Sequence, residues 1–205
     1  MSYNSLLSFG DLIPLKLKCD VKKLFGETEK FVYLKYNPRK DIERYGLSIT
    51  SLDGSLNGVD LDSIKEYNKE NNTEYDELSF NKFTEVYHTS SEIQKIVEPF
   101  KNHIGRSHIL SLQEGGYFPP HRDLPVYVEQ QNSLRILVPL KGCNPPDMYF
   151  MYEDKPLHFE HGRAYFLNTN KSHNLFSFKG SYMVVLNIKT SEEVYQILGD
   201  NFQAR

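Results

Sequence analysis

Two histidines and one aspartate in this sequence have the types and spacing of a set of metal ligands. His121 and Asp123 are separated by one residue, and His173 follows Asp123 after 173 − 123 = 50 residues. Side chains two positions apart on a strand point to the same side, so His121 and Asp123 can share one face of a metal ion. A distant histidine brought alongside completes a facial triad with open coordination positions. Such a set is typical of non-haem Fe(II) sites that carry out oxygen chemistry.

The surroundings of these residues favour a site over a chance pattern. His121 follows the chain-breaking run at residues 115–120, and His173 ends a second such run at residues 168–173. Between the two runs lies an apolar segment that carries one arginine, Arg135. Other interpretations stay open: a histidine that caps a turn, a salt bridge between Asp123 and Arg122, or a zinc site.

The elements that must position these residues are short and mostly of β type. Segments rich in β-formers recur between turns of Gly, Pro and Asn, at residues 106–113, 133–140, 147–153, 164–168, 175–178 and 181–188. Regularly spaced short strands of this kind predict a sandwich or jelly roll. Earlier in the chain, residues 30–36 read as another strand, and the polar residues 66–77 read as a surface loop or helix end.

Two helices have recognisable start sites. Thr89 and Glu92 have capping-box spacing ahead of apolar residues at helical intervals, which are Ile93, Ile96, Val97 and Phe100. Ser191 caps a last helix over residues 191–198. We therefore predict one domain, mainly β with flanking helices. It comprises an N-terminal α/β elaboration (1–103), a double-stranded β-helix core of jelly-roll, cupin-like form (104–190) and a C-terminal helix (191–205).

The composition of the chain indicates what kind of partner and what location to expect. The 205 residues carry a formal net charge of −3 without a block of like charges, which gives no reason to expect nucleic acid or an anionic membrane as a partner. Cys19 and Cys143 lack metal-type spacing and indicate reduced thiols. Residues 1–18 do not resemble a signal peptide, and no apolar run has the length of a membrane span. We expect a cytoplasmic protein.

Residues 104–190, under half of the chain, also resemble a known family. The motifs are, in order, RSHILSL from Arg106, HRD from His121, LRILVPL from Leu134, GRAYFLN from Gly162 and HN from His173. This order and spacing resemble the aspartyl/asparaginyl β-hydroxylase-like branch of the 2-oxoglutarate/Fe(II) dioxygenases. That branch includes bacterial proline hydroxylases, and similar short proteins occur in phages.

The resemblance implies a reaction, its cofactors and a location. It implies that His121, Asp123 and His173 hold Fe(II) and form the catalytic centre, with 2-oxoglutarate and O2 as co-substrates. The reaction would hydroxylate a C–H bond of an amino acid or peptidyl side chain and release succinate and CO2. The substrate would be a small molecule or a peptide, in the cytoplasm of a bacterium or of the host of a phage.

One departure from the family pattern concerns the cation that holds the far carboxylate of 2-oxoglutarate. Many members have an arginine about ten residues beyond the distal histidine, and here that position is Met183 (183 − 173 = 10). Other branches place the cation some fourteen residues beyond the first histidine, where this chain has Arg135 (135 − 121 = 14). A buried arginine needs an anionic partner. We predict that Arg135 is the anchor, with pairing to an internal Asp or Glu as one alternative and Lys179 as the other candidate cation.

Three further residues are candidates for contact with the co-substrate. Arg106 alternates with His108 on the strand that leads to the first ligands, and could hold a carboxylate or form a structural ion pair. His108 could contact 2-oxoglutarate or be a core histidine. Asn174 follows the distal ligand and could orient it or serve as a turn residue.

Two other functions compete with that of a hydroxylase. A non-catalytic jelly-roll module that binds a ligand or a partner is compatible with Met183 in place of the usual arginine. A metalloenzyme of cupin type that works without 2-oxoglutarate is the other possibility, although cupin sites generally use more histidines in a different spacing. Formation of succinate separates the hydroxylase from both.

Overall fold

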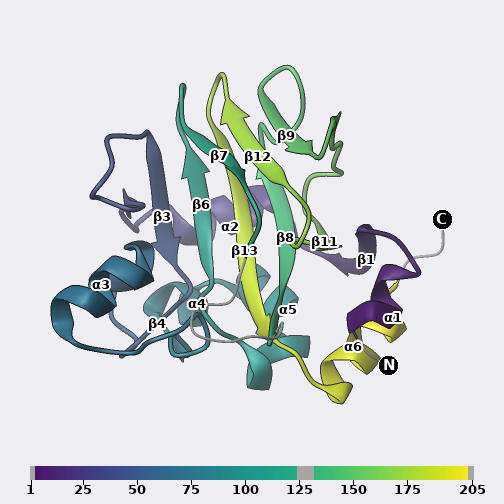
Figure 1. Ribbon diagram of the computed structural model, residues 1–205, viewed down its shortest axis with the longest axis horizontal. Helices are drawn as coiled ribbons and strands as arrows, with labels where there is room; N and C mark the ends of the chain where they lie inside the picture. Colours follow the sequence, from purple (N-terminus) through teal and green to yellow (C-terminus); the bar gives the residue numbers. More distant parts are fainter. Residues whose placement is uncertain (1–2, 124–131, 203–205) are drawn as a thin grey trace.

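Two facing β-sheets dominate the computed structural model, which describes residues 3–123 and 132–202 (Figure 1). The larger sheet has the order β1 (Leu12–Lys18), β11 (Arg163–Leu167), β8 (Ser133–Lys141), β13 (Ser181–Lys189), β6 (His108–Leu112), β3 (Arg44–Ser48), β2 (Leu34–Lys35). The smaller sheet has the order β10 (Lys155–Pro156), β9 (Met148–Tyr152), β12 (His173–Ser177), β7 (Tyr117–His121). The short strands β4 (Thr50–Ser51) and β5 (Lys82–Phe83) pair separately.

The eight strands β6 to β13 form a double-stranded β-helix. Strands β6, β8, β11 and β13 lie in the larger sheet, and β7, β9, β10 and β12 lie in the smaller one. The chain thus crosses repeatedly between the sheets and winds into a jelly roll. The predicted fold class is confirmed.

The N-terminal part adds strands to both edges of this core. Strand β1 pairs with β11 at one edge of the larger sheet, and β3 pairs with β6 at the other. The helical elements of the described chain are α1 (Tyr3–Leu7), α2 (Val21–Thr28), η1 (Val59–Leu61), α3 (Ile64–Asn71), α4 (Glu85–Thr89), α5 (Ser91–Val97), η2 (Glu98–His103) and α6 (Glu192–Asn201). None of them is long and apolar enough to cross a membrane.

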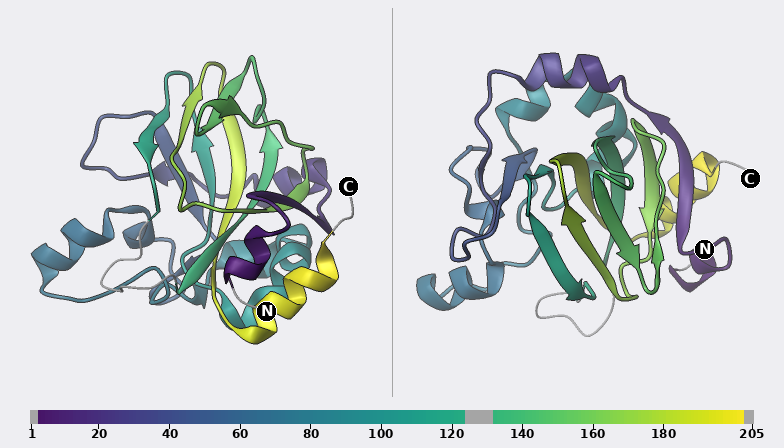
Figure 2. Two further views of the ribbon diagram at one scale, coloured as in Figure 1. Left: turned by 45° about the vertical axis from the view of Figure 1, so that its right-hand side comes forward. Right: turned by 90° about the horizontal axis from the view of Figure 1, so that it is seen from above.

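The larger sheet separates two apolar cores. On its outer face Ile136 and Val184 pack with Leu24 of α2, Ile93 of α5 and Val194 of α6, and Figure 2 shows these helices outside the barrel. The second core lies between the sheets, where the inner faces of the strands meet, and includes Leu110, Leu137, Met183, Phe150 and Leu175. Strand alternation produces this division, because successive side chains point to opposite faces.

Most of the predicted elements are present. The six predicted β segments correspond to β6, β8, β9, β11, β12 and β13. The predicted helix after Thr89 is α5, although its cap is Ser90, whose hydroxyl accepts from the N–H of Ile93 at 3.2 Å. The hydroxyl of Ser191 accepts from the N–H of Val194 at 3.1 Å and caps α6, as predicted.

The predicted strand at residues 30–36 is wrong for most of its length. Only Leu34–Lys35 pairs, as β2 at the sheet edge, and Val32 is 76% exposed. The β-forming residues there lack a partner strand, and packing context decides such segments more than propensity does. The sequence also failed to predict β1, β3 and β7, which contain Pro14, Gly46 and the Pro119–Pro120 pair respectively.

Candidate metal centre

The two candidate histidines face each other across neighbouring strands. Strands β7 and β12 are antiparallel partners, and His121 lies opposite His173. Their ring centroids are 4.3 Å apart. Sheet pairing therefore brings together two residues that lie far apart in the sequence.

An irregularity in β7 directs His121 towards the barrel. Between the pairs His173–His121 and Leu175–Phe118, strand β7 has one more residue than β12. The extra residue lies in the Pro119–Pro120 pair, whose prolines cannot donate to the ladder. As a result Phe118 and His121 both line the cavity between the sheets, although they are three positions apart.

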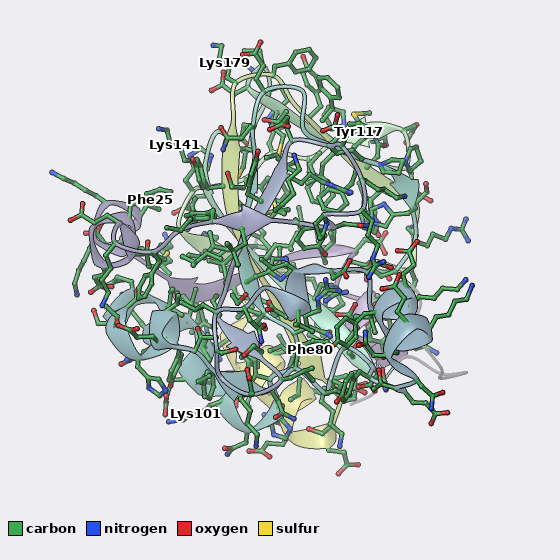
Figure 3. The ribbon with its side chains drawn as sticks, turned by 90° about the vertical axis from the view of Figure 1, so that its left-hand side faces the viewer. Phe25, Phe80, Lys101, Tyr117, Lys141 and Lys179 are labelled. Atoms are coloured by element: carbon green, nitrogen blue, oxygen red, sulfur yellow. The ribbon has the colours of Figure 1, made fainter. Side chains whose placement is uncertain are left out.

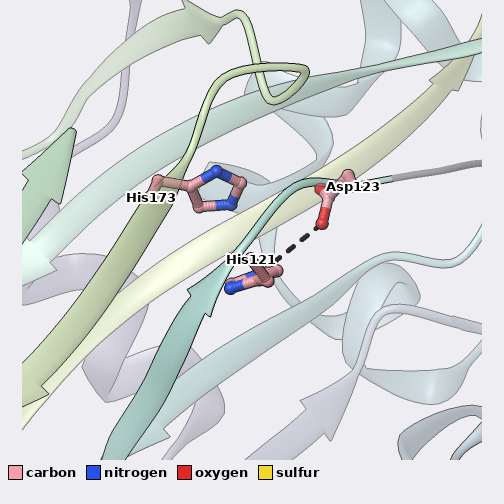
Figure 4. Close-up of side chains that lie close together, drawn as sticks. All are labelled: His121, Asp123 and His173. Carbon is pink, nitrogen blue, oxygen red and sulfur yellow. Dashed lines mark ion pairs between the residues drawn. The ribbon is translucent and has the colours of Figure 1, made fainter. Parts of the chain in front are cut away.

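Asp123 completes the triad just beyond the end of β7. Its N–H donates to the carbonyl of Thr169 at 3.0 Å, which ties it to the chain after β11. Its Oδ1 lies 3.6 Å from Nε2 of His121 (Figure 4). One ligand atom from each of His121, Asp123 and His173 can be chosen so that all lie within 4.8 Å of one another.

The backbone sets the tautomer of both histidines. Nδ1 of His121 lies 2.7 Å from the carbonyl oxygen of Pro119, and Nδ1 of His173 lies 2.9 Å from that of Lys171. A carbonyl oxygen only accepts hydrogen bonds, so each Nδ1 carries the proton. The lone pair is then on Nε2, as in metal-binding histidines whose other nitrogen donates to a carbonyl. Burial also lowers the pKa of His173, which favours the neutral ring that a metal needs.

Arg135 of β8 holds the carboxylate of the triad. Its Nε donates to Oδ2 of Asp123 at 2.9 Å, which leaves Oδ1 on the side of the histidines. Burial alone would raise the pKa of Asp123, but the charge and hydrogen bond of Arg135 outweigh it and lower that pKa below its ordinary value. Asp123 is therefore ionised at neutral pH, as a metal ligand must be.

A cavity opens beside the triad and has an apolar floor and a polar side. The floor is formed by side chains of both sheets, Leu110, Leu137, Phe150, Leu175, Met183 and Val185. The polar side consists of Tyr36, Glu77, Arg106, His108, Thr169 and Arg135. Two imidazole nitrogens and one carboxylate oxygen at such a cavity fit an Fe(II) ion with open coordination positions.

Three of the five candidates for co-substrate binding line this cavity. Arg135 and Leu137 share the inner face of β8. Arg135 is also paired internally, since Nη1 lies 3.4 Å from Oε2 of Glu77 in addition to the bond to Asp123. The alternative of an internal acidic partner is thus present in the structure.

Arg106 and His108 differ in how they are held. Arg106 donates to the backbone carbonyls of Asp60 and Asp62 and lies 3.4 Å from Glu77, so its role is at least in part structural. His108 is 5% exposed, and its Nδ1 has no hydrogen-bond partner among the described residues. Burial lowers the pKa of His108 well below its ordinary value, so the ring is neutral. His108 thus places a neutral ring with one unsatisfied, buried nitrogen at the wall of the cavity.

The other two candidates lie away from the cavity. Asn174 is opposite Met151 and, as the neighbour of His173 on β12, points to the other face of the smaller sheet. Lys179 has a side chain that is 70% exposed and pairs with Asp147 at 3.0 Å. Figure 3 shows Lys179 at the tip of the molecule.

The sequence failed to identify Glu77, Tyr36 and Asn187 as neighbours of the site. Glu77 belongs to a polar segment that reads as a surface loop, yet its carboxylate lies between two arginines. Only the need of Arg135 for an acidic partner pointed to such a residue, and spacing could not name it.

Comparison with solved structures finds proteins that this chain resembles at low sequence identity. An oxidoreductase of the 2OG-Fe(II) oxygenase family from Burkholderia pseudomallei is 9% identical, with a TM-score of 0.49 over 91% of this chain and 89% of its own. A Pseudomonas putida prolyl-4-hydroxylase is 7% identical, with a TM-score of 0.48 over 91% and 96%. An RmlC-like cupin protein from Desulfovibrio desulfuricans is 13% identical, with a TM-score of 0.31 over 42% and 72%. No family model matches the sequence, and no curated protein matches it. Function is therefore inferred from the side chains of the site alone.

Proposed function

We propose that this protein is an Fe(II)- and 2-oxoglutarate-dependent oxygenase. The observation that carries the proposal is the arrangement of His121, Asp123 and His173. Their ligand atoms lie within 4.8 Å of one another at the edge of a cavity, and both Nδ1 atoms are engaged by backbone carbonyls. Two neutral imidazoles and one carboxylate on a single face are the donor set that non-haem Fe(II) oxygenases use.

The protein's part in the reaction is to hold and orient the groups. Fe(II) and 2-oxoglutarate would supply the oxidising power that hydroxylates a C–H bond, with O2 consumed and succinate and CO2 released. His121, Asp123 and His173 would hold the metal, and Arg135 would keep the carboxylate of Asp123 oriented. The guanidinium group of Arg135 lines the cavity and would supply the donors for a carboxylate of 2-oxoglutarate.

We propose an amino acid or a peptidyl side chain as the substrate. Leu110, Met183 and Phe150 give part of the cavity an apolar lining. Charged groups lie only at its polar side, close to the metal centre. Such a cavity suits a ligand that presents carboxylate groups towards the metal and carbon groups towards the floor.

Succinate formation tests the proposal. Purified protein supplied with Fe(II), ascorbate, O2 and 2-oxoglutarate should release succinate above an iron-only blank, because slow decarboxylation does not require the true substrate. Asp123→Ala removes a metal ligand and should abolish this activity. The matched control is Asp154→Ala, which alters an exposed aspartate and should leave the rate unchanged.

A ligand-binding module is the second candidate. Met183 on the cavity floor and the internal pairing of Arg135 both favour it. It predicts stoichiometric metal binding without succinate, also in the presence of a panel of amino acids and peptides. That result would exclude the oxygenase.

A further inference from the structure

A carboxylate of the protein itself already lies in a cradle of three donors beside the metal centre. Oε2 of Glu77 accepts from Nδ2 of Asn187 at 3.2 Å and lies 3.4 Å from Nη1 of Arg135. Oε1 of Glu77 lies 3.4 Å from Nη1 of Arg106. Asn187 and Arg135 belong to β13 and β8, and Arg106 precedes β6, so the donors come from three adjacent strands.

The two guanidinium groups of the cradle have partners other than Glu77. Arg106 donates through Nε to the carbonyl of Asp60 and through Nη2 to that of Asp62, the latter at 3.0 Å. Arg135 donates through Nε to Asp123 at 2.9 Å. Both guanidinium groups would therefore keep their positions if the carboxylate of Glu77 moved away.

Glu77 itself is fixed by its backbone and only loosely by its side chain. The N–H of Arg106 donates to the carbonyl of Glu77 at 2.7 Å, and a Cβ on Gly105 would come within 2.7 Å of the same oxygen. The side-chain contacts of 3.2–3.4 Å are longer than the roughly 2.7–2.9 Å of strong charge-assisted hydrogen bonds. Rotation of the side chain alone would free the cradle, without movement of the loop.

We propose that Glu77 is a placeholder that a ligand carboxylate displaces from Arg106, Asn187 and Arg135. Of the two arginines, Asp123 pairs with Arg135 alone, so Glu77 is the anion that both buried guanidinium groups share until a ligand arrives. This inference rests on the proposed function, because it takes 2-oxoglutarate as the natural occupant. Glu77 then competes with the ligand for the three donors, and this competition sets the ligand concentration that is needed to fill the site.

The competition predicts in which direction the ligand affinity changes when Glu77 is removed. A binding site that is free only a fraction of the time shows an affinity reduced by that fraction. If Glu77 occupies the cradle about nine-tenths of the time, its removal tightens ligand binding about tenfold. A residue that merely supported the site would have the opposite effect.

The test is calorimetric titration of the Mn(II)-loaded protein with 2-oxoglutarate and, separately, with glutarate. Glutarate has both carboxylates but no keto group, so it reports on the cradle without keto-acid chelation. Glu77→Gln removes the competing charge, and Glu77→Asp retracts it by one methylene, in case the amide variant does not fold. Both should bind about tenfold more tightly than the parent. The control is Glu74→Gln, an exposed residue of the same loop, which should leave both affinities unchanged.

The outcomes separate this inference from the proposed function. Equal or weaker binding by folded Glu77 variants, with 2-oxoglutarate still bound by the parent, overturns the placeholder and leaves the oxygenase standing. Tighter glutarate binding by the variants without any 2-oxoglutarate binding supports the placeholder and removes the oxygenase. No binding of either acid to any form overturns both. Failure of both variants to fold also overturns the placeholder, since Glu77 would then be structural.

Discussion

Arg135 has two roles in the structure that its position in the sequence could not separate. It orients Asp123 through Nε at 2.9 Å, and it faces Glu77 through Nη1 at 3.4 Å. A ligand carboxylate would replace only the second contact. Arg135 lines the cavity, and its hydrogen bond to Asp123 also joins it to the candidate metal ligands.

Arg135→Gln should therefore raise the 2-oxoglutarate requirement steeply. Loss of a charged contact in a partly buried site costs about 2–5 kcal/mol, which is about 30-fold or more in affinity. Lys179→Gln should have little effect, because the side chain of Lys179 is 70% exposed and pairs with Asp147. The measurement is the 2-oxoglutarate dependence of succinate formation at saturating Fe(II).

Metal binding should change less in the same variant. Removal of a partner that orients a metal ligand typically weakens binding about tenfold or more, so we expect a Kd for Fe(II) about tenfold higher for Arg135→Gln. If Lys179→Gln instead shows the larger 2-oxoglutarate effect, the anchor is Lys179 and the assignment to β8 is wrong.

At the scale of elements, a carboxylate joins two helices that cover the larger sheet. Glu27 of α2 accepts from the hydroxyls of Ser90 and Ser91, both at 2.6 Å, and from the N–H of Glu92 at 3.2 Å. Partial burial alone would raise the pKa of Glu27, but these hydrogen bonds lower it to about 2. The carboxylate thus stabilises the N-terminus of α5 in its ionised form.

The sign of the pH effect follows from this lowered pKa. A carboxyl group whose pKa is lower in the folded than in the unfolded protein stabilises the fold at pH values above its unfolded pKa, which for Glu27 is near 4.5. That contribution is lost as the pH falls towards 2, the pKa in the folded protein. Glu27→Gln should lower the free energy of unfolding by about 1 kcal/mol at pH 7 and by progressively less between pH 4.5 and 2. Urea unfolding at a series of pH values measures this. Glu29→Gln, an exposed neighbour, is the control, and a pH-independent difference for Glu27→Gln would contradict the role of its charge.

At the scale of the whole molecule, the candidate metal ligands are held by several strands of the jelly roll. His121 and His173 come from the smaller sheet, and Asp123 is tied to the chain after β11 and to β8 of the larger sheet. A metal bound by these three residues joins both sheets. It therefore stabilises the folded state as a whole.

Divalent metal should accordingly raise the melting temperature. Mn(II) at a free concentration 100-fold above its Kd adds about 2.7 kcal/mol, or roughly 5–10 °C for a chain of this size. His121→Ala should melt near the metal-free parent, because its side chain is 35% exposed, and should show no increase with metal. Differential scanning calorimetry with and without EDTA measures both. An equal increase in the variant would place the metal elsewhere.

The sequence by itself indicated the core strands and the residues of the candidate metal site. Alternation and chain-breaking residues are local properties, so they located β6, β8 and β13, and residue type with spacing selected His121, Asp123 and His173. Local patterns failed to predict strands whose formation depends on a neighbouring strand. Residues 30–36 have strand-forming side chains but pair only at Leu34–Lys35, and β7 forms despite its two prolines because β12 lies beside it.

Only the tertiary structure decided which acidic groups meet Arg135. Glu77 lies 135 − 77 = 58 residues before it, in a polar loop that nothing in the sequence distinguishes from a solvated one. The path of that loop follows from its packing against Gly105 and from the backbone bond to Arg106. The spacing of Glu77 and Arg135 along the chain does not predict their contact, because the path of the loop depends on the residues that it packs against. The candidate ligand set was thus readable from the chain, whereas Glu77 as an acidic partner of Arg135 was not.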